Sequence, residues 1–228
     1  IYRYYPSASP QFISERLEKD HGYDIVMLKN GDIIYGVNFY HLIKYSQGNW
    51  KRTHYILHLG QAMKRSGYRG NIIWKLGTWY SRKNISRTFF LENVTGIASF
   101  ISPKAFEHFT RLFPRHHYQP ITQKDKTVRD FIVSYFDQIR GMSVDYNQDF
   151  CFDSPDLEVE DITKDWDRIY RAKNEVFNQL FSDLGIIKME NNRIYKMPRH
   201  VTACGIRRPL LNKRYNFPKP NYFLAAAV

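Results

Sequence analysis

The sequence predicts an α+β fold of short, mostly antiparallel strands with about four helices. Residues 23–40 are rich in β-branched and aromatic side chains around Asn30-Gly31, a pair that supplies the positive φ angles of a hairpin turn. Residues 127–140 carry apolar side chains at helical spacing, and residues 186–197 suggest a second hairpin. The 228 residues are enough for one large domain or two small ones.

The first half of the chain is expected to add one helix and several short strands. Residues 54–66 fit a helix, because their apolar side chains recur at helical spacing and Gly67 stands where a C-terminal cap belongs. The short strand candidates are residues 71–76, 88–91 and 96–101.

Three further helices are expected after residue 101. Ser102-Pro103 is an N-cap followed by proline at the first helical position, which indicates a helix that ends before Pro114. Residues 127–140 form the clearest amphipathic helix, and residues 164–184 form a longer one. Because a hairpin directly follows the last helix, this part of the chain resembles the end of a winged-helix domain.

Charge and proline content suggest how the chain is organised. The predicted parts are a basic α+β domain at residues 1–141, an acidic linker or loop at 142–163, a helix plus hairpin at 164–197 and an extended basic tail at 198–228. Alternatively, residues 1–197 form a single domain. The tail is expected to be extended because its prolines disfavour the interiors of helices and strands.

Positive charge is concentrated along the sequence. The chain has 34 Lys and Arg against 22 Asp and Glu, and no acidic residue lies between Asp32 and Glu92. Residues 145–167 show the opposite bias, because their only basic residue is Lys164. Clustered Lys and Arg bind polyphosphates by releasing condensed counterions, so this pattern predicts a nucleic-acid partner.

Aromatic side chains occur among these cations. Exposed rings can stack on unpaired bases, although most of the rings are expected in the core. Trp50-Lys51-Arg52 and residues 79–83 are the best candidates, since both place rings beside cations. The predicted nucleic-acid-binding residues are Trp50, Lys51, Arg52, His54, His58, Lys64, Arg65, Arg69, Trp79, Tyr80, Arg82, Lys83, Arg87, Arg207, Arg208, Lys213 and Arg214.

No metal or other cofactor is expected at the histidines. His54 and His58 have a spacing that can chelate a metal on a helix, but Tyr55 stands where a zinc protease has Glu. We therefore interpret them as part of a polar stripe that faces RNA or solvent.

The acidic segment permits a different function. Asp149, Asp153, Asp156 and Glu158 are close enough in sequence to hold Mg²⁺, as the carboxylates of a nuclease do. The competing interpretation is an acidic loop that caps the following helix and neutralises a basic surface. Only the nuclease alternative requires Mg²⁺ as a cofactor.

The function expected from the sequence is nucleic-acid binding, with RNA as the partner, by a non-catalytic subunit of a ribonucleoprotein or replication assembly that includes other proteins. The alternatives are a Mg²⁺-dependent nuclease or other phosphoryl-transfer enzyme, and a structural capsid or organellar assembly subunit. No phosphate-binding glycine loop or nucleophile elbow is present. No apolar run approaches membrane-spanning length, so no membrane partner is expected. Only two cysteines, Cys151 and Cys204, favour an intracellular or virion-associated protein over a secreted one.

Overall fold

A computed structural model describes residues 24–46, 53–65, 68, 72–85, 93–113, 115–117, 126–139, 151–154 and 158–207, and it confirms the α+β class. The chain divides into two compact units. The first unit is Ile1–Ile97 with Ile206–Val228, and the second is Ala98–Gly205. The domain boundaries drawn from the sequence stay a prediction. None of the helices in these ranges is long and apolar enough to cross a membrane.

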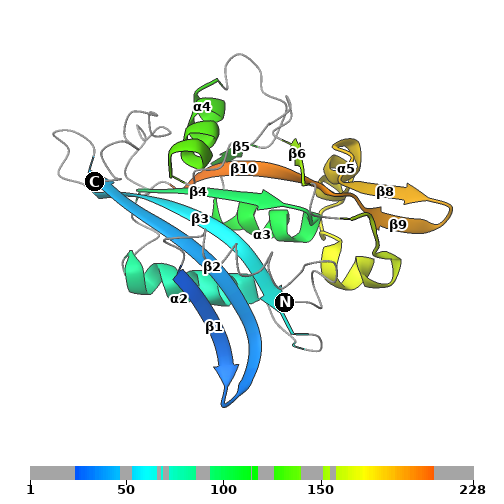
Figure 1. Ribbon diagram of the computed structural model, residues 1–228, viewed down its shortest axis with the longest axis horizontal. Helices are drawn as coiled ribbons and strands as arrows, with labels where there is room; N and C mark the ends of the chain where they lie inside the picture. Colours follow the sequence, from blue (N-terminus) through cyan, green and yellow to red (C-terminus); the bar gives the residue numbers. More distant parts are fainter. Residues whose placement is uncertain are drawn as a thin grey trace. The chain divides into compact units, whose positions relative to one another are not determined.

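A sheet with strand order β1-β2-β3-β4 is the centre of the first unit (Figure 1). Its strands are β1 (Asp24–Asn30), β2 (Ile33–Ser46), β3 (Thr53–Lys64) and β4 (Asn93–Phe100). The β1–β2 hairpin is confirmed, with Asn30 paired to Ile33 and a positive φ of 54° at Gly31. Its two-residue loop is Gly31-Asp32, one position later than expected.

The predicted helix at residues 54–66 is wrong, because these residues form β3. β3 pairs antiparallel with β2 and parallel with β4, so it is a central strand. Its residues 55–59 are all buried, including side chains on both faces of the sheet. A strand covered on both faces lacks the alternation of a half-exposed strand, and its apolar run also fits helical spacing. β2 and β3 are also longer than the short strands we expected.

The predicted strand at residues 71–76 is also wrong, because α2 (Ile72–Asn84) begins there. The side chains of Ile72, Leu76 and Tyr80 recur every four residues and are buried, as on the inner face of a helix. α2 packs against β1 and β2 (Figure 1). The β-branched pair at residues 72–73 favours a strand locally, and packing against the sheet overrides that preference.

The second unit contains three elements that largely follow the sequence analysis. Ser102 caps α3 (Pro103–Leu112), and its hydroxyl accepts a hydrogen bond from the Ala105 amide at 3.4 Å. The helix expected at residues 127–140 is present as α4 (Lys126–Ser134), followed by a π-helical segment at Tyr135–Ile139. The buried side chains of α4 and the π-helical segment include Phe131, Ile132, Tyr135 and Phe136.

Three further strands lie mainly in the second unit. β10 (Arg199–Arg207) is joined by β5 (Arg115–His117) and pairs antiparallel with β6 (Cys151–Asp153). Residues 199–207 were expected in the extended tail, and they form a sheet strand instead. The remainder of that tail, residues 208–228, lies outside the described residues.

A separate sheet with order β7-β9-β8 lies in the second unit (Figure 1). Its strands are β7 (Glu160–Asp161), β8 (Ile187–Glu190) and β9 (Arg193–Lys196). The expected β8–β9 hairpin is confirmed, and both residues of its turn, Asn191 and Asn192, have positive φ. Positive φ at both positions is the requirement of a type I′ turn.

The long helix expected at residues 164–184 is interrupted. A 3-10 turn at Thr163–Asp165 and a π-helical turn at Trp166–Tyr170 precede α5 (Glu175–Asp183). The buried amide of Asn178 accepts from the Ala172 amide at 2.8 Å and donates to the Ala172 carbonyl at 3.1 Å. These bonds satisfy the backbone at the interruption. The hairpin does follow α5 directly, and the winged-helix resemblance stays a prediction.

Candidate nucleic-acid interface

The exposed side of α2 carries an aromatic ring between two lysines. Lys75, Trp79 and Lys83 are four residues apart, so they follow one another along the same side of the helix. Trp79 is 52% exposed, and the Lys83 ammonium lies 5.1 Å from the centroid of its ring. Arg82 is exposed on the same side. Lys75, Trp79, Arg82 and Lys83 together are called the α2 surface below.

Lys75 is also held by a contact with an aromatic residue. Its ammonium lies 3.3 Å from the Tyr68 hydroxyl and 5.8 Å from the centroid of the Tyr68 ring. The Tyr68 ring in turn lies 5.4 Å from that of Tyr35 on β2. The contacts of Lys75 and Lys83 are therefore with rings, which leave the positive charge of each lysine uncompensated.

The opposite side of α2 determines which way the α2 surface faces. A Cβ atom at Gly36 of β2 would lie 2.3 Å from Cδ1 of Ile72, so glycine leaves the space in which Ile72 packs. One turn after Leu76, the Tyr80 ring lies parallel to that of Tyr40 on β2, with 4.4 Å between centroids and 12° between planes. These contacts turn Trp79, the neighbour of Tyr80, toward solvent.

Polar contacts add to this packing. The Tyr80 hydroxyl donates a hydrogen bond to the Asp24 carboxylate of β1, and the Tyr40 hydroxyl accepts one from Asn38 Nδ2 at 2.6 Å. Burial raises the pKa of both phenols well above the usual range, and the Asp24 carboxylate raises the pKa of Tyr80 further. Both rings are therefore neutral structural groups at physiological pH.

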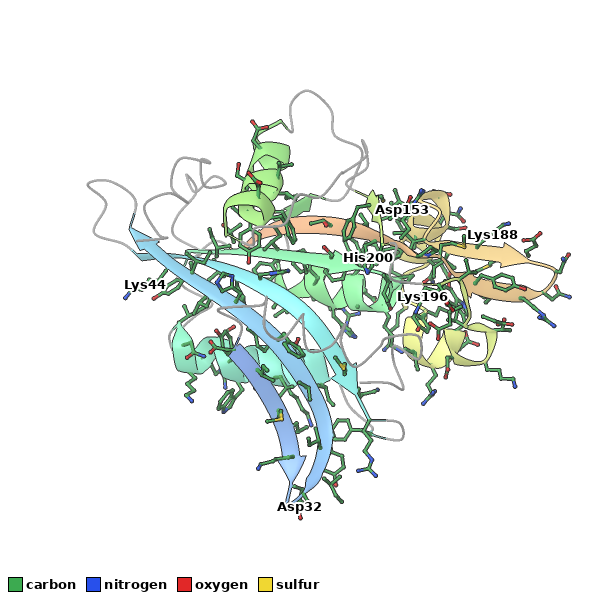
Figure 2. The ribbon with its side chains drawn as sticks, viewed as in Figure 1. Asp32, Lys44, Asp153, Lys188, Lys196 and His200 are labelled. Atoms are coloured by element: carbon green, nitrogen blue, oxygen red, sulfur yellow. The ribbon has the colours of Figure 1, made fainter. Side chains whose placement is uncertain are left out.

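The cations of the first unit have no acidic partners in the part of that unit that the structure describes. The acidic residues there are Asp24, which accepts from Tyr80, and Asp32, at the hairpin turn. Figure 2 shows Asp32 at this turn and Lys44 near the other end of β2. The exposed cations without a carboxylate oxygen within 4.0 Å among these residues are Lys29, Lys44, Lys64, Arg65, Lys75, Arg82 and Lys83.

Many cations of the second unit are paired instead. Lys188 lies 2.8 Å from Glu190, and Arg171 lies 3.1 Å from Asp167 and 2.5 Å from Glu175. The other paired cations are Arg111, Arg168, Arg193, Lys196 and Arg199. Lys164 and Lys173 of this unit are exposed and have no carboxylate oxygen of the described residues within 4.0 Å. Because the paired cations are compensated locally, most of the uncompensated positive charge of the described residues lies in the first unit.

Two residues proposed from the sequence as nucleic-acid contacts are buried. Tyr80 is 1% exposed and already stacks on Tyr40, so its ring cannot stack on a base. His58 is 6% exposed in the central strand β3. The helical stripe that was to contain His54 and His58 does not exist, because these residues are on a strand. We therefore remove Tyr80 and His58 from the candidate interface.

Five of the predicted contacts are exposed, and many others lie outside the described residues. The exposed ones are Lys64, Arg65, Trp79, Arg82 and Lys83. His54 and Arg207 belong to β3 and β10, but their side chains are not described. The contacts outside the described residues are Trp50, Lys51, Arg52, Arg69, Arg87, Arg208, Lys213 and Arg214. Lys75 was missed, and its spacing of four residues from Trp79 would have identified it once a helix was recognised.

The carboxylates proposed for Mg²⁺ are described only in part. Asp153 on β6 accepts from Arg199 Nε at 2.7 Å, and this contact lowers the pKa of Asp153 below its ordinary value. Figure 2 places Asp153 beside His200, whose ring stacks on Phe152 at 4.9 Å. Glu158 is exposed, and Asp149 and Asp156 lie outside the described residues. Within the described ranges, no group of three or more His, Cys, Asp or Glu side chains could hold a metal ion.

No protein-family model matches the chain, and no curated protein sequence matches it at a significant level.

Proposed function

We propose that this protein binds nucleic acid through its first unit, with RNA as the partner, and that it does so as a non-catalytic subunit of a ribonucleoprotein or replication assembly. The observation that carries the proposal is the set of exposed Lys and Arg side chains in the first unit that have no carboxylate partner among the described residues. Such side chains repel one another, and an anionic partner relieves that repulsion.

The two units differ in how their cations are paired. This difference favours a binding surface on the first unit over a general attraction of the basic chain for nucleic acid. A cation paired with a carboxylate, such as Lys188 with Glu190, has little net attraction for a phosphate. Lys75 and Lys83 contact aromatic rings instead and keep their full charge. Phosphates of a nucleic acid replace the counterions around such lysines, and the released ions make binding favourable.

The non-catalytic part of the proposal rests on Asp153. Its carboxylate is bound by Arg199 through Nε at 2.7 Å and a second guanidinium nitrogen at 3.3 Å. A guanidinium at that distance opposes the binding of a cation to the same carboxylate. Incubation of labelled RNA and DNA with the protein and Mg²⁺ tests this point. Cleavage that disappears in Asp153→Ala would establish the nuclease instead.

Binding as a function of salt concentration tests the proposal as a whole. We expect a fluorescently labelled RNA to bind the full chain with an association constant that falls linearly as log salt rises. The slope should be about −0.7 per phosphate contacted on a single strand. A slope near zero would contradict phosphate contacts, and self-association of the chain without nucleic acid would then favour the structural-subunit alternative.

A further inference from the structure

The geometry of the α2 surface points to an unpaired strand as its ligand. We propose that one base of a single-stranded RNA stacks on Trp79, while the neighbouring phosphates contact Lys75 and Lys83. This inference rests on the proposed function and adds the strandedness of the substrate, the residue that recognises it and the order of contacts along α2.

The exposure of Trp79 is the first reason. The indole is 52% exposed although its neighbour Tyr80 is 1% exposed, so the fold turns the larger apolar ring outward. In a duplex the bases already stack on one another, and the faces of the bases are not accessible from the outside. An indole on the exposed side of a helix therefore gains stacking only from an unpaired base.

The order of the charges is the second reason. Lys75 and Lys83 lie one turn before and one turn after Trp79, about 6 Å along the helix axis in each direction. Every base in a strand has one phosphate on each side, so the cation–ring–cation order of α2 matches the phosphate–base–phosphate order of the ligand. Arg82, on the same side, provides a third cation for the strand.

In the free protein, the Lys83 side chain already contacts the Trp79 ring. The Lys83 ammonium lies 5.1 Å from the Trp79 centroid, which is within the range of a cation–π contact. The contact is weak at an exposed site, so a phosphate can recruit this ammonium without a large loss. A base can then use the ring while Lys83 contacts the phosphate beside it, and both residues contribute to the same nucleotide.

The test measures binding of the full chain to two labelled RNAs of the same length, about 12 nucleotides. One is a single strand without self-complementarity, and the other is a duplex that contains the same strand. Trp79→Ala should weaken single-strand binding roughly tenfold, which is what removal of one stacked base produces, and should leave duplex binding unchanged within about twofold. Trp79→Phe keeps a stacking ring and should restore most of the affinity.

Two lysine variants separate local charge from net charge. Lys83→Gln and Lys188→Gln remove one positive charge each, but Lys188 is in the second unit and is paired with Glu190. We expect Lys83→Gln to weaken single-strand binding several-fold and Lys188→Gln to change it by less than about twofold. Equal effects of the two substitutions would overturn the assignment of Lys83 to a phosphate.

The possible failures are distinguishable. If the unaltered chain binds neither RNA, the proposed function fails. If it binds both RNAs and Trp79→Ala affects neither, or affects both equally, the proposed function stands and the single-strand assignment is overturned. A thermal unfolding curve for each variant accompanies the binding data. If Trp79→Ala fails to fold, Trp79→Gln replaces it in both binding measurements, because it also removes the ring and places a polar side chain at an exposed position.

Discussion

The side chain of Ile72 fills the space that any side chain at Gly36 would occupy, because a Cβ atom at Gly36 would lie 2.3 Å from Cδ1 and 2.8 Å from Cγ2 of Ile72. The contact joins the first residue of α2 to the beginning of β2, where Gly36 is the fourth residue of the strand. It therefore sets the position of the helix that presents Trp79 to solvent. The candidate interface therefore depends on a glycine of β2 that contacts the buried side of α2.

Gly36→Ala should destabilise the protein. The added methyl overlaps both the Ile72 side chain and the Met63 carbonyl, which lies 3.1 Å from the Cβ position. Overpacking of this kind costs about 1–3 kcal/mol, measured as a lower urea midpoint of unfolding. Ile72→Ala in the same chain removes the overlap with Ile72, so the double variant should lose less stability than the two single substitutions added together.

Gly77→Ala is the matched control for that substitution. A Cβ atom at Gly77 of α2 would lie 3.4 Å from the Tyr40 hydroxyl, which is an ordinary contact distance. Alanine is favoured over glycine inside a helix by up to about 1 kcal/mol. We therefore expect unchanged or slightly higher stability. A destabilisation as large as that of Gly36→Ala would contradict the described packing of α2 on β2.

Trp79 and Tyr80 should differ in what they contribute to stability. Tyr80→Phe removes the hydroxyl that donates to Asp24 and should cost about 1 kcal/mol, because Asp24 can still be hydrated. Tyr80→Ala also empties the site against Tyr40 and should cost about 3–5 kcal/mol. Trp79→Ala, at an exposed position, should cost less than about 1 kcal/mol. Chemical denaturation of the three variants checks this order, and a reversed order would place Trp79 in the core.

Substitution of the two partners in the Lys196–Glu160 ion pair of the second unit should have unequal effects on stability. Lys196 is 5% exposed, and its ammonium is paired with Glu160 and lies 6.0 Å from the Tyr170 centroid. Glu160→Ala leaves that ammonium buried without a carboxylate and should cost about 1–3 kcal/mol, less than for a fully buried pair. Lys196→Met removes the buried charge and keeps the volume, so its stability should change by less than about 1 kcal/mol. Equal destabilisation of the two variants in thermal unfolding would contradict this account.

Stability at acidic pH should depend on Asp153. Arg199 lowers the pKa of Asp153 in the folded protein, so the unfolded chain takes up the proton first as the pH falls. The stabilisation is therefore complete above the ordinary pKa of 3.8 and is lost as the pH falls through the lower folded value. Asp153→Asn should be less stable at neutral pH by under about 1 kcal/mol, because the pair is exposed. The difference should vanish at low pH, and a difference independent of pH would mean that the carboxylate charge has no part in it.

Elements that depend on local chemistry could be predicted from the sequence. The two hairpins require positive φ at Gly31 and at Asn191 and Asn192, and glycine and asparagine are the residues that adopt it readily. The start of α3 was also predictable from local chemistry, because the Ser102 hydroxyl accepts a hydrogen bond from the backbone amide three residues later.

Elements that depend on distant partners could not be predicted. The interruption before α5 is stabilised by the Glu107 carboxylate of α3, which accepts from the Lys173 amide at 3.0 Å. α2 depends on Gly36, which is 36 residues earlier than Ile72. Trp79 and Lys83 could be recognised as candidates because they are near in sequence, whereas Lys75 can be recognised only when residues 72–84 are known to form a helix. The burial of Tyr80 follows from its contact with Tyr40, and no local sequence pattern indicates that contact.

The most direct measurement is the salt dependence of RNA binding by two triple variants in which the same number of positive charges is removed. One is Lys75→Gln, Arg82→Gln, Lys83→Gln on the α2 surface, and the other is Arg171→Gln, Lys188→Gln, Arg193→Gln at paired sites of the second unit. We expect the first variant to reduce the magnitude of the log–log slope by about 2, near 0.7 for each phosphate that is no longer neutralised, and the second to leave it close to that of the unaltered chain. Equal slopes for the two variants would show that net charge alone attracts RNA, and would contradict a binding surface on α2.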